Sequence, residues 1–297
     1  MSINVSVIGG DLRQLSVANT LSNAGYDVQL SGFNPENEKI RSFGCDLAIL
    51  QDIGEFEKDA NICILPLPVS RDGEAVYAPL VGKNAKPILL RSLFENFPRN
   101  AVFFGGNVSE YTHRLAAEYN RKIIDYWQDE QLQVRNAVPT AEGAAAIAIQ
   151  ELKTTVAGSR CTVIGFGRVG KALGMTLVRL GAEVTVAARS TADRGWAKAF
   201  GCKTITHEEY LITPCDADIV YNTVPVTLLT EHVLCRYKSR PILVELASYP
   251  GIDSKSAETL GFRLIQAGGL PGKVAPVTAG RIIGETVLDL MPKEMRL

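Results

Sequence analysis

CTVIGFGRVG, at residues 161–170, is the stretch that decides the fold of this chain. Its first four residues are an apolar run typical of a buried strand, and its glycines follow the spacing G-x-G-x-x-G. A helical pattern follows over 171–180, and a second apolar run follows over 183–188. The glycine spacing alone is weak evidence, but strand, glycine turn, helix and strand in this order predict a dinucleotide-binding βαβ unit.

Each glycine of this turn has its own expected role. Gly165 makes the tight turn, Gly167 lets a pyrophosphate approach the backbone, and Gly170 lets the helix pack closely on its strand. The helix N-terminus offers free N–H groups and partial positive charge to the phosphates. The alternative is a glycine turn in an α/β domain without a ligand. The expected cofactor-binding residues of the turn are Gly165, Phe166, Gly167, Arg168, Val169 and Gly170.

The end of the second apolar run should distinguish the two nicotinamide cofactors. NAD-specific sites usually carry an acidic residue there, which binds the ribose 2′-hydroxyl. This chain has Arg189 and Ser190 instead. A guanidinium can stack on the adenine and pair with a 2′-phosphate. We therefore expect NADP, with NAD and a solvated surface arginine as the alternative interpretation.

Short apolar runs alternate with helical segments along the whole chain. In the first half the runs lie at 3–8, 27–30, 46–50, 61–65, 86–90 and 101–104, with helical spacing over 11–24 and 109–119. Alternation of this kind predicts parallel sheets with helices on both faces. We expect an α/β fold of two Rossmann-like, doubly wound parallel-sheet domains joined by a long bridging helix.

The bridging helix sets the expected domain boundaries. Thr140 resembles an N-cap, and residues 141–153 are rich in helix formers. We expect an N-terminal α/β domain over 1–137 and a bridging helix with an NAD(P)-binding domain over 138–276. After a glycine-proline loop at 268–272, a helix is expected from about 277 to 290. The terminal residues 277–297 are expected to complete the first domain.

The first half also begins with a strand and a glycine turn, Gly9-Gly10-Asp11. The third glycine is missing, and Asp11 would repel a pyrophosphate. Asp11 is expected to cap the next helix instead. We therefore expect the first half to bind a substrate or a partner rather than a dinucleotide.

The bulk properties exclude several classes of function. With a formal net charge of -1 the chain carries no global field for nucleic acids or anionic membranes. It shows no run of about eighteen apolar residues and no signal peptide. The cysteines, Cys45, Cys63, Cys161, Cys202, Cys215 and Cys235, are scattered without a C-x-x-C pair. We expect a reduced, cytoplasmic protein without a metal site, and a homo-oligomer is compatible with these features.

Ligands of such sheets bind beyond the carboxyl ends of the strands. In the second half, Asn222, Thr223 and Pro225 are expected near the nicotinamide, where an amide and a hydroxyl can hold the carboxamide. His113, His207 and His232 are expected to be ordinary helix or surface residues. Glu142 is the candidate for proton transfer, although an acid in a first helical turn can be purely stabilising. The candidate substrate ligands are Ser70, Arg71, Asn107, Thr140, Ser248 and Thr278.

At these same segments the chain resembles the family of dipicolinate synthase A subunits from spore-forming bacteria. The similarity spans nearly the whole length and is specific in combination. It rests on I-G-G-D-x-R at 8–13, P-T-x-E-G at 139–143, V-I-G-F-G-R-V-G at 163–170, N-T-V-P at 222–225, L-A-S-x-P-G at 246–251 and G-L-P-G-x-V-A-P-x-T-A-G at 269–280. More distantly, two such domains resemble D-2-hydroxyacid and alanine dehydrogenases, but the arginine-glutamate-histidine set of the hydroxyacid enzymes cannot be placed.

The resemblance implies formation of dipicolinate (pyridine-2,6-dicarboxylate) from a dihydro- or hydroxytetrahydro-dipicolinate precursor. It also implies that a flavoprotein-like B subunit of dipicolinate synthase is the partner, and that expression takes place in the mother-cell cytoplasm during sporulation. Two alternatives stay open. One is an NADP-dependent dehydrogenase of another amino or keto acid. The other is a non-catalytic regulatory protein that binds NADP(H).

Overall fold

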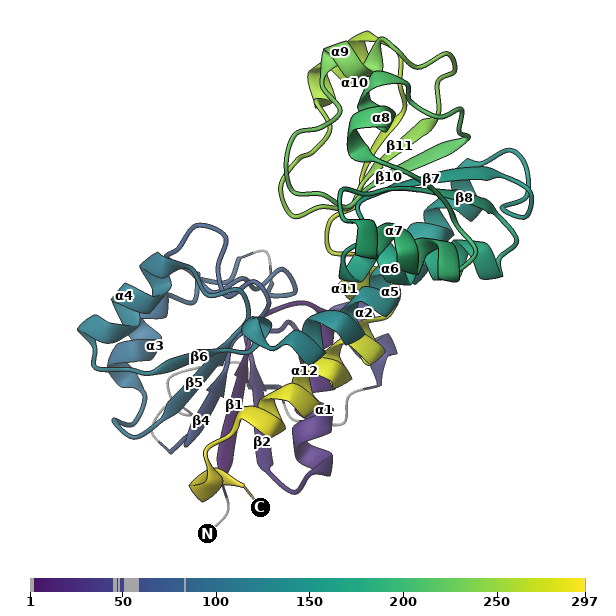
Figure 1. Cartoon of the computed structure of the whole chain (residues 1–297). Coiled ribbons are helices and arrows are strands. Elements are labelled where there is room, and N and C mark those ends of the chain that lie inside the picture. The colour runs from purple at the N-terminus through teal and green to yellow at the C-terminus, as the bar shows by residue number, and fades with distance from the viewer. Residues whose placement is uncertain (1–2, 45–46, 48, 51–58, 83, 297) are drawn as a thin grey trace. The chain divides into compact units, whose positions relative to one another are not determined.

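The chain folds into two compact units, each built on its own parallel sheet (Figure 1). The computed structural model describes residues 3–44, 47, 49–50, 59–82 and 84–296. Unit 1 comprises Met1–Gln133 and Ala275–Leu297, and unit 2 comprises Val134–Val274. Cys45 and two residues of the strand expected over 46–50 lie outside the described residues.

The first sheet has the strand order β3-β2-β1-β4-β5-β6, in which every pair is parallel. Its strands are β1 (Asn4–Ile8), β2 (Asp27–Ser31), β3 (Ile49–Leu50), β4 (Ile62–Ile64), β5 (Val102–Gly105) and β6 (Ile123–Asp125). The helices of unit 1 are α1 (Leu12–Asn23), α2 (Glu38–Phe43), α3 (Leu90–Asn96), α4 (Glu110–Glu118), α12 (Pro276–Leu290) and the short η1 (Tyr126–Gln128) and η2 (Lys293–Met295).

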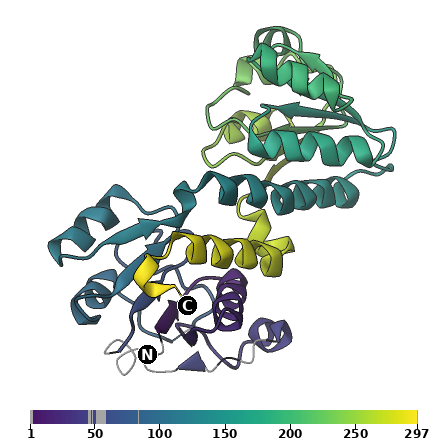
Figure 2. The same ribbon diagram turned by 60° about the horizontal axis from the view of Figure 1, so that its bottom comes forward.

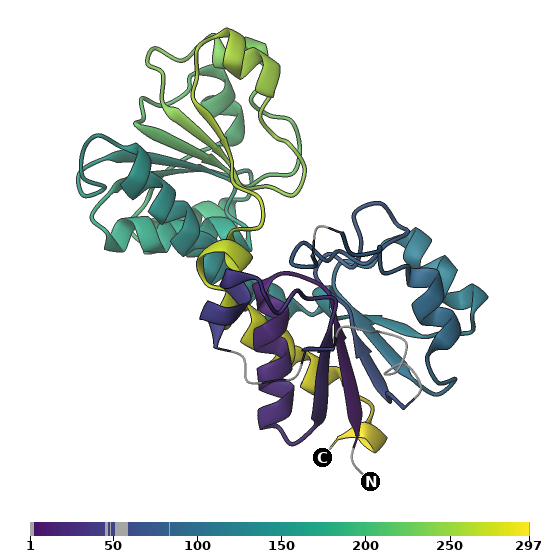
Figure 3. The ribbon, with the colours of Figure 1, turned by 180° about the vertical axis from the view of Figure 1, so that it is seen from behind.

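Successive side chains of these strands enter cores on opposite faces of the sheet. Val5 and Val7 of β1 pack with α1 and α12, whereas Ile8 packs with α3 and α4. The helices α1 and α12, from the two ends of the chain, thus share one hydrophobic core. They lie side by side in every view (Figures 1, 2 and 3). Their approach depends on Gly280, since a Cβ there would stand 2.2 Å from the carbonyl oxygen of Arg13.

One expectation for the first half was wrong, and one strand was missed. The run at 86–90 forms no strand: Leu89 makes one isolated antiparallel bridge to Ala75, and α3 begins at Leu90. Proline at position 87 supplies no N–H for a ladder, and periodicity cannot separate a short apolar run from the start of a helix. Conversely, β6 was not anticipated, because its three residues are too few to show a pattern.

The long helix α5 (Glu130–Glu151) begins about three turns earlier than expected. The carboxylate of Asp129 accepts a hydrogen bond from the Leu132 amide at 2.7 Å and supplies the cap. Pro139 lies inside the helix, and the Thr140 hydroxyl donates to the Asn136 carbonyl oxygen at 2.9 Å. The Thr140 N-cap was therefore a wrong prediction: a proline inside a helix removes one hydrogen bond but does not always end the helix.

The second sheet has the order β12-β11-β10-β7-β8-β9, again all parallel. Numbered from its own first strand, this is the 3-2-1-4-5-6 order of dinucleotide-binding domains, and the first sheet has the same order. The doubly wound prediction is confirmed for both units. The elements are β7 (Arg160–Ile164), α6 (Arg168–Arg179), β8 (Glu183–Ala187), α7 (Thr191–Ala199), β9 (Lys203–Ile205), α8 (His207–Ile212), β10 (Ile219–Asn222), α9 (Glu231–Leu234), β11 (Ile242–Glu245), α10 (Ser254–Thr259), β12 (Leu264–Gln266) and α11 (Leu270–Val274).

The expected glycine-proline loop at 268–272 is only partly a loop, because α11 starts at Leu270. This short helix packs against α5: a Cβ on Gly143 would stand 3.1 Å from the Leu270 side chain. Proline suits the first turn of a helix, where its missing N–H is not needed. The packing partner therefore decides the conformation of a segment whose composition favours a loop.

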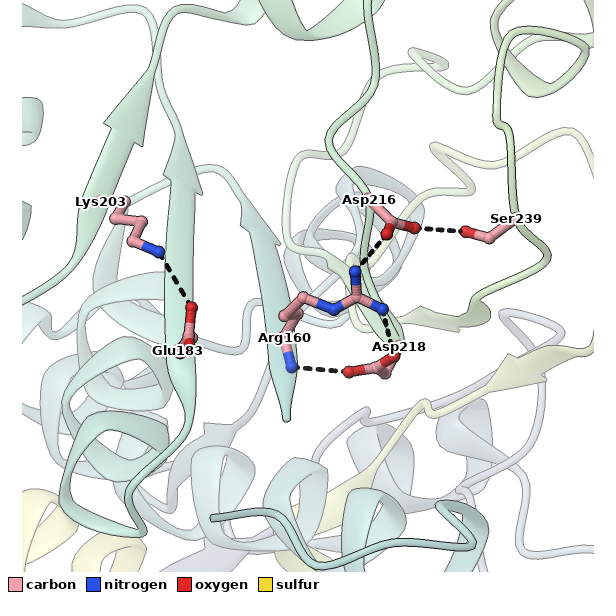
Figure 4. Close-up of polar contacts among 6 residues, drawn as sticks. All are labelled: Arg160, Glu183, Lys203, Asp216, Asp218 and Ser239. Carbon is pink, nitrogen blue, oxygen red and sulfur yellow. Dashed lines mark hydrogen bonds and ion pairs between the residues drawn. The ribbon is translucent and has the colours of Figure 1, made fainter. Parts of the chain in front are cut away.

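The amino-terminal edge of the second sheet is held by ion pairs (Figure 4). Arg160, the first residue of β7, pairs with Asp216 and Asp218, and its backbone amide donates to the Asp218 carboxylate at 2.8 Å. Lys203 at the start of β9 pairs with Glu183 at the start of β8 at 2.9 Å. These charges lie at the opposite end of the strands from the glycine turn.

Candidate functional site

The turn between β7 and α6 forms a tight elbow. Gly165 has φ +92°, a left-handed conformation that strains any other residue. A Cβ on Gly165 would also stand 2.5 Å from the Thr223 hydroxyl, and one on Gly170 would stand 2.4 Å from the Gly165 carbonyl oxygen. Two of the three fingerprint glycines are thus required by the fold itself.

The fold itself does not require glycine at position 167. It has φ -74°, and a Cβ built on it meets no atom within 4 Å. It is the N-cap of α6, and no side chain caps that helix. The space beside the start of this twelve-residue helix is therefore open at Gly167. Free N–H groups and the helix dipole suit an anion such as a pyrophosphate.

A cavity of about 280 Å³ extends from this elbow across the carboxyl ends of β7, β8, β9 and β10. Its lining contains most of the residues expected for the cofactor and adds four that were not expected there: Ala188, Asp193, His207 and Val224. The complete lining is Gly165, Phe166, Gly167, Ala188, Arg189, Ser190, Asp193, His207, Thr223, Val224 and Pro225. Arg168, Val169 and Gly170 form the first turn of α6 beside it.

The end of the cavity beyond β8 is basic. Arg189 is exposed there, and its backbone carbonyl accepts a hydrogen bond from Arg194 at 2.6 Å. The hydroxyl of Ser190 caps α7 by accepting from the Asp193 amide at 3.2 Å. The carboxylate of Asp193 pairs with Lys171 at 3.3 Å, so the one acid in the cavity lining faces a cation.

His207 is not the surface residue that its neighbouring glutamates suggest. Its side chain is buried, and its Nε2 lies 2.9 Å from the Ala187 carbonyl oxygen. Burial lowers the pKa of this imidazole, the contact with Ala187 opposes that effect, and the nearby charge of Arg189 lowers the pKa further. The ring is therefore mostly neutral near pH 7.

The loop after β10 combines a lining residue with a supporting one. The Thr223 hydroxyl donates to the Ile164 carbonyl oxygen at 2.9 Å and borders the elbow. Asn222 is fully buried, and its amide nitrogen donates to Val224 and to Glu245. Its side-chain oxygen accepts from the Val224 amide. This geometry favours support of the loop over the expected contact with a carboxamide.

Glu245 at the end of β11 is a buried carboxylate that sequence reasoning missed. It accepts hydrogen bonds from the Asn222 side chain at 2.8 Å and from the amides of Ala247, Gly251 and Ile252 at 3.0, 2.7 and 3.0 Å. A buried carboxylate needs such donors. Glu245 thereby ties the loops after β10 and β11 together beside the cavity.

The glycine turn of unit 1 is closed by its own chain. The Gly10 amide donates to the Tyr77 carbonyl oxygen at 2.7 Å, and a Cβ on Gly9 would stand 2.9 Å from Val76. Asp11 caps α1 by accepting from the Arg13 amide, as predicted. The residues around Tyr77 therefore occupy the place that a pyrophosphate would need, which supports the expectation that this turn binds no dinucleotide.

The loops after β4 and β5 bring three candidate substrate ligands to one edge of the first sheet. The Val69 amide donates to the Gly106 carbonyl oxygen at 3.0 Å and joins these loops. Arg71 lies 4.2 Å from the centroid of the Tyr77 ring and donates to its hydroxyl at 3.1 Å. Ser70 binds Asp72 at 2.9 Å, and Asn107 has φ +54°.

The remaining candidates are scattered. Thr140 lies in the middle of α5, bonded to its own helix, and Glu142 is exposed two positions further along the same helix. Glu142 is thus not in a first helical turn, contrary to expectation. Ser248 is exposed after β11, and Thr278 is exposed at the start of α12. None of these residues lines the cavity described above.

Comparison with known proteins identifies the family. The A subunit of dipicolinate synthase from Bacillus subtilis (strain 168) is 33% identical over 97% of this chain and 96% of its own length. The chain belongs to the family of dipicolinate synthase A subunits. The model of the N-terminal domain of these subunits matches residues 4–127. The model of the D-isomer specific 2-hydroxyacid dehydrogenase NAD-binding domain matches residues 125–239.

Two solved structures of dipicolinate synthase A subunits are similar to this chain over nearly its whole length. The Bacillus halodurans structure is 28% identical with a TM-score of 0.86, and covers 98% of both chains. The Bacillus subtilis structure is 30% identical with a TM-score of 0.82, covering 97% of this chain and 95% of that one. The chain is therefore an NAD(P)-dependent oxidoreductase of this family, and the match to the NAD-binding domain covers residues 125–239. No helix in the described part of the chain could span a membrane.

Proposed function

We propose that this chain forms dipicolinate by NADP-dependent oxidation of a dihydro- or hydroxytetrahydro-dipicolinate precursor. The observation that carries the proposal is the open, uncapped start of α6 in a chain that is 33% identical to a dipicolinate synthase A subunit. The fold requires glycine at 165 and 170, whereas the open space at Gly167 supports the approach of a pyrophosphate there.

The preference for NADP rests on the charges at the far end of the cavity. Arg189 stands where NAD-binding domains usually carry an acid, and Asp193 is paired with Lys171. A guanidinium pairs well with the dianionic 2′-phosphate. Gly165, Gly167 and the first turn of α6 would hold the pyrophosphate, and Thr223 and Pro225 would border the nicotinamide.

The overall reaction needs little acid-base help. Dihydrodipicolinate loses two electrons and one proton as hydride and a second proton to solvent, and a hydroxylated precursor first loses water. When bound, the oxidised nicotinamide supplies the hydride acceptor. Formation of the aromatic ring provides the driving force, so positioning is the main task of the protein. Glu142 remains our candidate for the proton transfer, since its exposed carboxylate has no hydrogen bond to a described residue that would occupy it.

The two carboxylates of the precursor need cationic and hydroxyl donors. Arg71 is oriented by Tyr77 through only one edge of its guanidinium, and the other N–H groups have no polar partner among the described residues. It is the strongest candidate for a substrate carboxylate, with Ser70 and Asn107 on the same edge of the sheet. Thr140, Ser248 and Thr278 complete the proposed set of substrate ligands.

The direct test is an assay of the purified chain with NADP and enzymatically generated precursor, followed by the absorbance of reduced nicotinamide. The expected result is turnover that depends on NADP and is lost in Arg71→Ala, with cofactor binding unchanged. Cofactor binding without turnover, even at high enzyme concentration, would contradict catalysis by this chain alone and favour the regulatory alternative. If the chain oxidises another amino or keto acid faster than the dipicolinate precursor, the alternative of a dehydrogenase for that acid would be favoured.

The relatives are named as one subunit of dipicolinate synthase, which implies a second one. We propose that this chain works with a flavoprotein-like B subunit in the mother-cell cytoplasm of a spore-former. Co-expression followed by size-exclusion chromatography tests the complex. If the isolated chain is inactive but the complex turns over the precursor, then catalysis requires the B subunit in addition to this chain. The size of the isolated chain in the same experiment reports whether it forms a homo-oligomer.

A further inference from the structure

His207 occupies a position that neither the fingerprint nor the family comparison explains. It is the first residue of α8, separated from the end of β9 by one residue, and its helix start is already capped by Thr206 and Glu209. Its side chain is 8% exposed, and yet it lines the cavity beside Arg189 and Ser190. A buried imidazole at the wall of a ligand cavity can therefore act on the ligand.

The contact with Ala187 decides which nitrogen titrates. A carbonyl oxygen only accepts hydrogen bonds, so Nε2, 2.9 Å away, carries a hydrogen in both protonation states. The nitrogen that gains or loses a proton when the imidazole titrates is therefore Nδ1. No described residue forms a hydrogen bond with Nδ1, and Nδ1 is not among the buried atoms without a partner. Nδ1 is thus not sealed inside the protein, and because His207 lines the cavity we infer that Nδ1 faces it, as an acceptor when neutral and a donor when protonated.

We propose that His207 binds the 2′-phosphate of NADP in its protonated form, so that the preference for NADP over NAD strengthens as the pH falls from about 8 to about 6.5. The inference rests on the proposed use of NADP and adds to it a residue that reads the phosphate. Arg189 supplies a permanent charge to the same group, and His207 supplies a conditional one.

The surrounding charges set the direction of the effect. Arg189 follows β8, Asp193 and Arg194 lie on α7, Lys171 lies on α6, and Glu208 and Glu209 lie on α8 itself. Arg194 is engaged with the carbonyls of Ala188 and Arg189, Asp193 with Lys171, and Glu209 with Thr206. Burial and Arg189 keep the pKa of the imidazole low in the free protein. A dianionic phosphate offsets both effects, because it neutralises Arg189 and accepts from Nδ1.

The expected rise in the pKa of His207 on NADP binding determines how the NADP affinity depends on pH. If the pKa of His207 is lower in the free protein than in the NADP complex, binding takes up a proton between the two pKa values. The affinity for NADP then falls as the pH rises through the pKa of the complex. NAD has no phosphate at this position, and its 2′-hydroxyl can donate to neutral Nδ1. Its binding should take up no proton at this site.

Isothermal titration calorimetry of the full chain, at about pH 7 in two buffers of different ionisation enthalpy, measures this uptake. His207→Gln is the matched variant, because the glutamine amide can keep the hydrogen bond to Ala187 while nothing titrates. We expect the wild type to take up more protons with NADP than His207→Gln does, and the two to be equal with NAD. The difference between proteins removes the titration of the 2′-phosphate itself, whose second pKa is about 6.

The expected affinity changes are equally specific. His207→Gln should weaken NADP about 10-fold at the acidic end of the range and NAD less than about 3-fold. His232→Gln, which changes an exposed histidine on α9 outside the cavity, should change neither. Should His207→Gln fail to fold, the imidazole of the wild type can be followed by nuclear magnetic resonance, with an upward pKa shift of about one unit or more on adding NADP.

Equal proton uptake by wild type and His207→Gln, or an imidazole pKa that NADP leaves unchanged, would overturn the inference while leaving NADP binding intact. Absence of any NADP heat would overturn the proposed cofactor as well. The two failures are therefore distinguishable in one experiment.

Discussion

The carbonyl oxygen of Gly165 lies directly against Gly170, so that a Cβ on Gly170 would stand 2.4 Å from it. Five residues apart in sequence, these glycines let α6 start immediately beside the end of β7. The N-terminus of the helix is thereby aimed across the carboxyl edge of the sheet. The cofactor site of this chain depends on that close approach.

Replacing Gly170 tests the approach itself. Gly170→Ala should destabilise unit 2 by about 1–3 kcal/mol, because the new methyl group meets backbone rather than a flexible side chain. Chemical denaturation measures the free energy of unfolding. A variant as stable as the wild type would show that α6 can shift away from the strand without loss.

Gly167→Leu should leave stability nearly unchanged but abolish most of the cofactor binding, in contrast to Gly170→Ala. Its backbone conformation suits any residue and its Cβ meets open space, so the melting temperature should change by only a few degrees. The leucine side chain would fill the place of the pyrophosphate, and we expect cofactor affinity to fall about 100-fold or more. Calorimetry and thermal unfolding on the same sample measure the two effects. Undiminished binding would locate the nucleotide elsewhere in the protein.

Arg189→Ala should separate the two cofactors. Loss of a charge-assisted contact predicts NADP binding about 10- to 100-fold weaker and NAD binding almost unchanged. Arg179→Ala, which removes an exposed arginine from the last turn of α6, is the matched control and should preserve the cofactor preference. Equal losses for NADP and NAD in Arg189→Ala would show that this residue does not read the 2′-phosphate.

The buried carboxylate of Glu245 should matter for both stability and binding. In Glu245→Gln the amide nitrogen cannot accept the bonds from Gly251 and Ile252, and a loss of about 2–4 kcal/mol is expected. Cofactor binding should weaken because the loop of Thr223 loses its support. Glu258→Gln on the exposed side of α10 serves as control. Wild-type stability in Glu245→Gln would mean that the loops hold their positions without this carboxylate.

The ion pairs at the opposite edge of the sheet predict a loss of stability in acid (Figure 4). Hydrogen bonds from Arg160 lower the pKa of Asp218, and those from Ser239 and Arg160 lower the pKa of Asp216. A carboxyl group whose pKa is lowered on folding stabilises the folded state at pH values above its pKa in the unfolded chain, about 3.9 for an aspartate. This stabilisation is lost as the pH falls through the pKa of the group in the folded state. The melting-temperature difference between wild type and Arg160→Gln should therefore shrink below about pH 4. A difference that is independent of pH would contradict the pairing.

The sequence revealed those parts of the molecule that local patterns determine. The β7–α6 elbow, the Asp11 cap and the alternation of strands and helices depend on neighbouring residues and were predicted correctly. The start of α5 was missed because a tolerated proline resembles a boundary. Asn222 was expected to face a ligand, but its register partner on β11 is Glu245, which draws the side chain into the protein. His207 and Asp193 reach the cavity only through tertiary packing, which no local pattern reports.

Hydrogen–deuterium exchange with and without NADP tests the central claim most directly, because it reports on the amides that should bind the phosphates. We expect protection of a peptide covering residues 164–172 on adding NADP, with no change in a peptide covering 6–14 around the closed turn of unit 1. Unchanged exchange at the start of α6 under saturating NADP, or protection at the first turn instead, would contradict the assignment of the cofactor to this elbow.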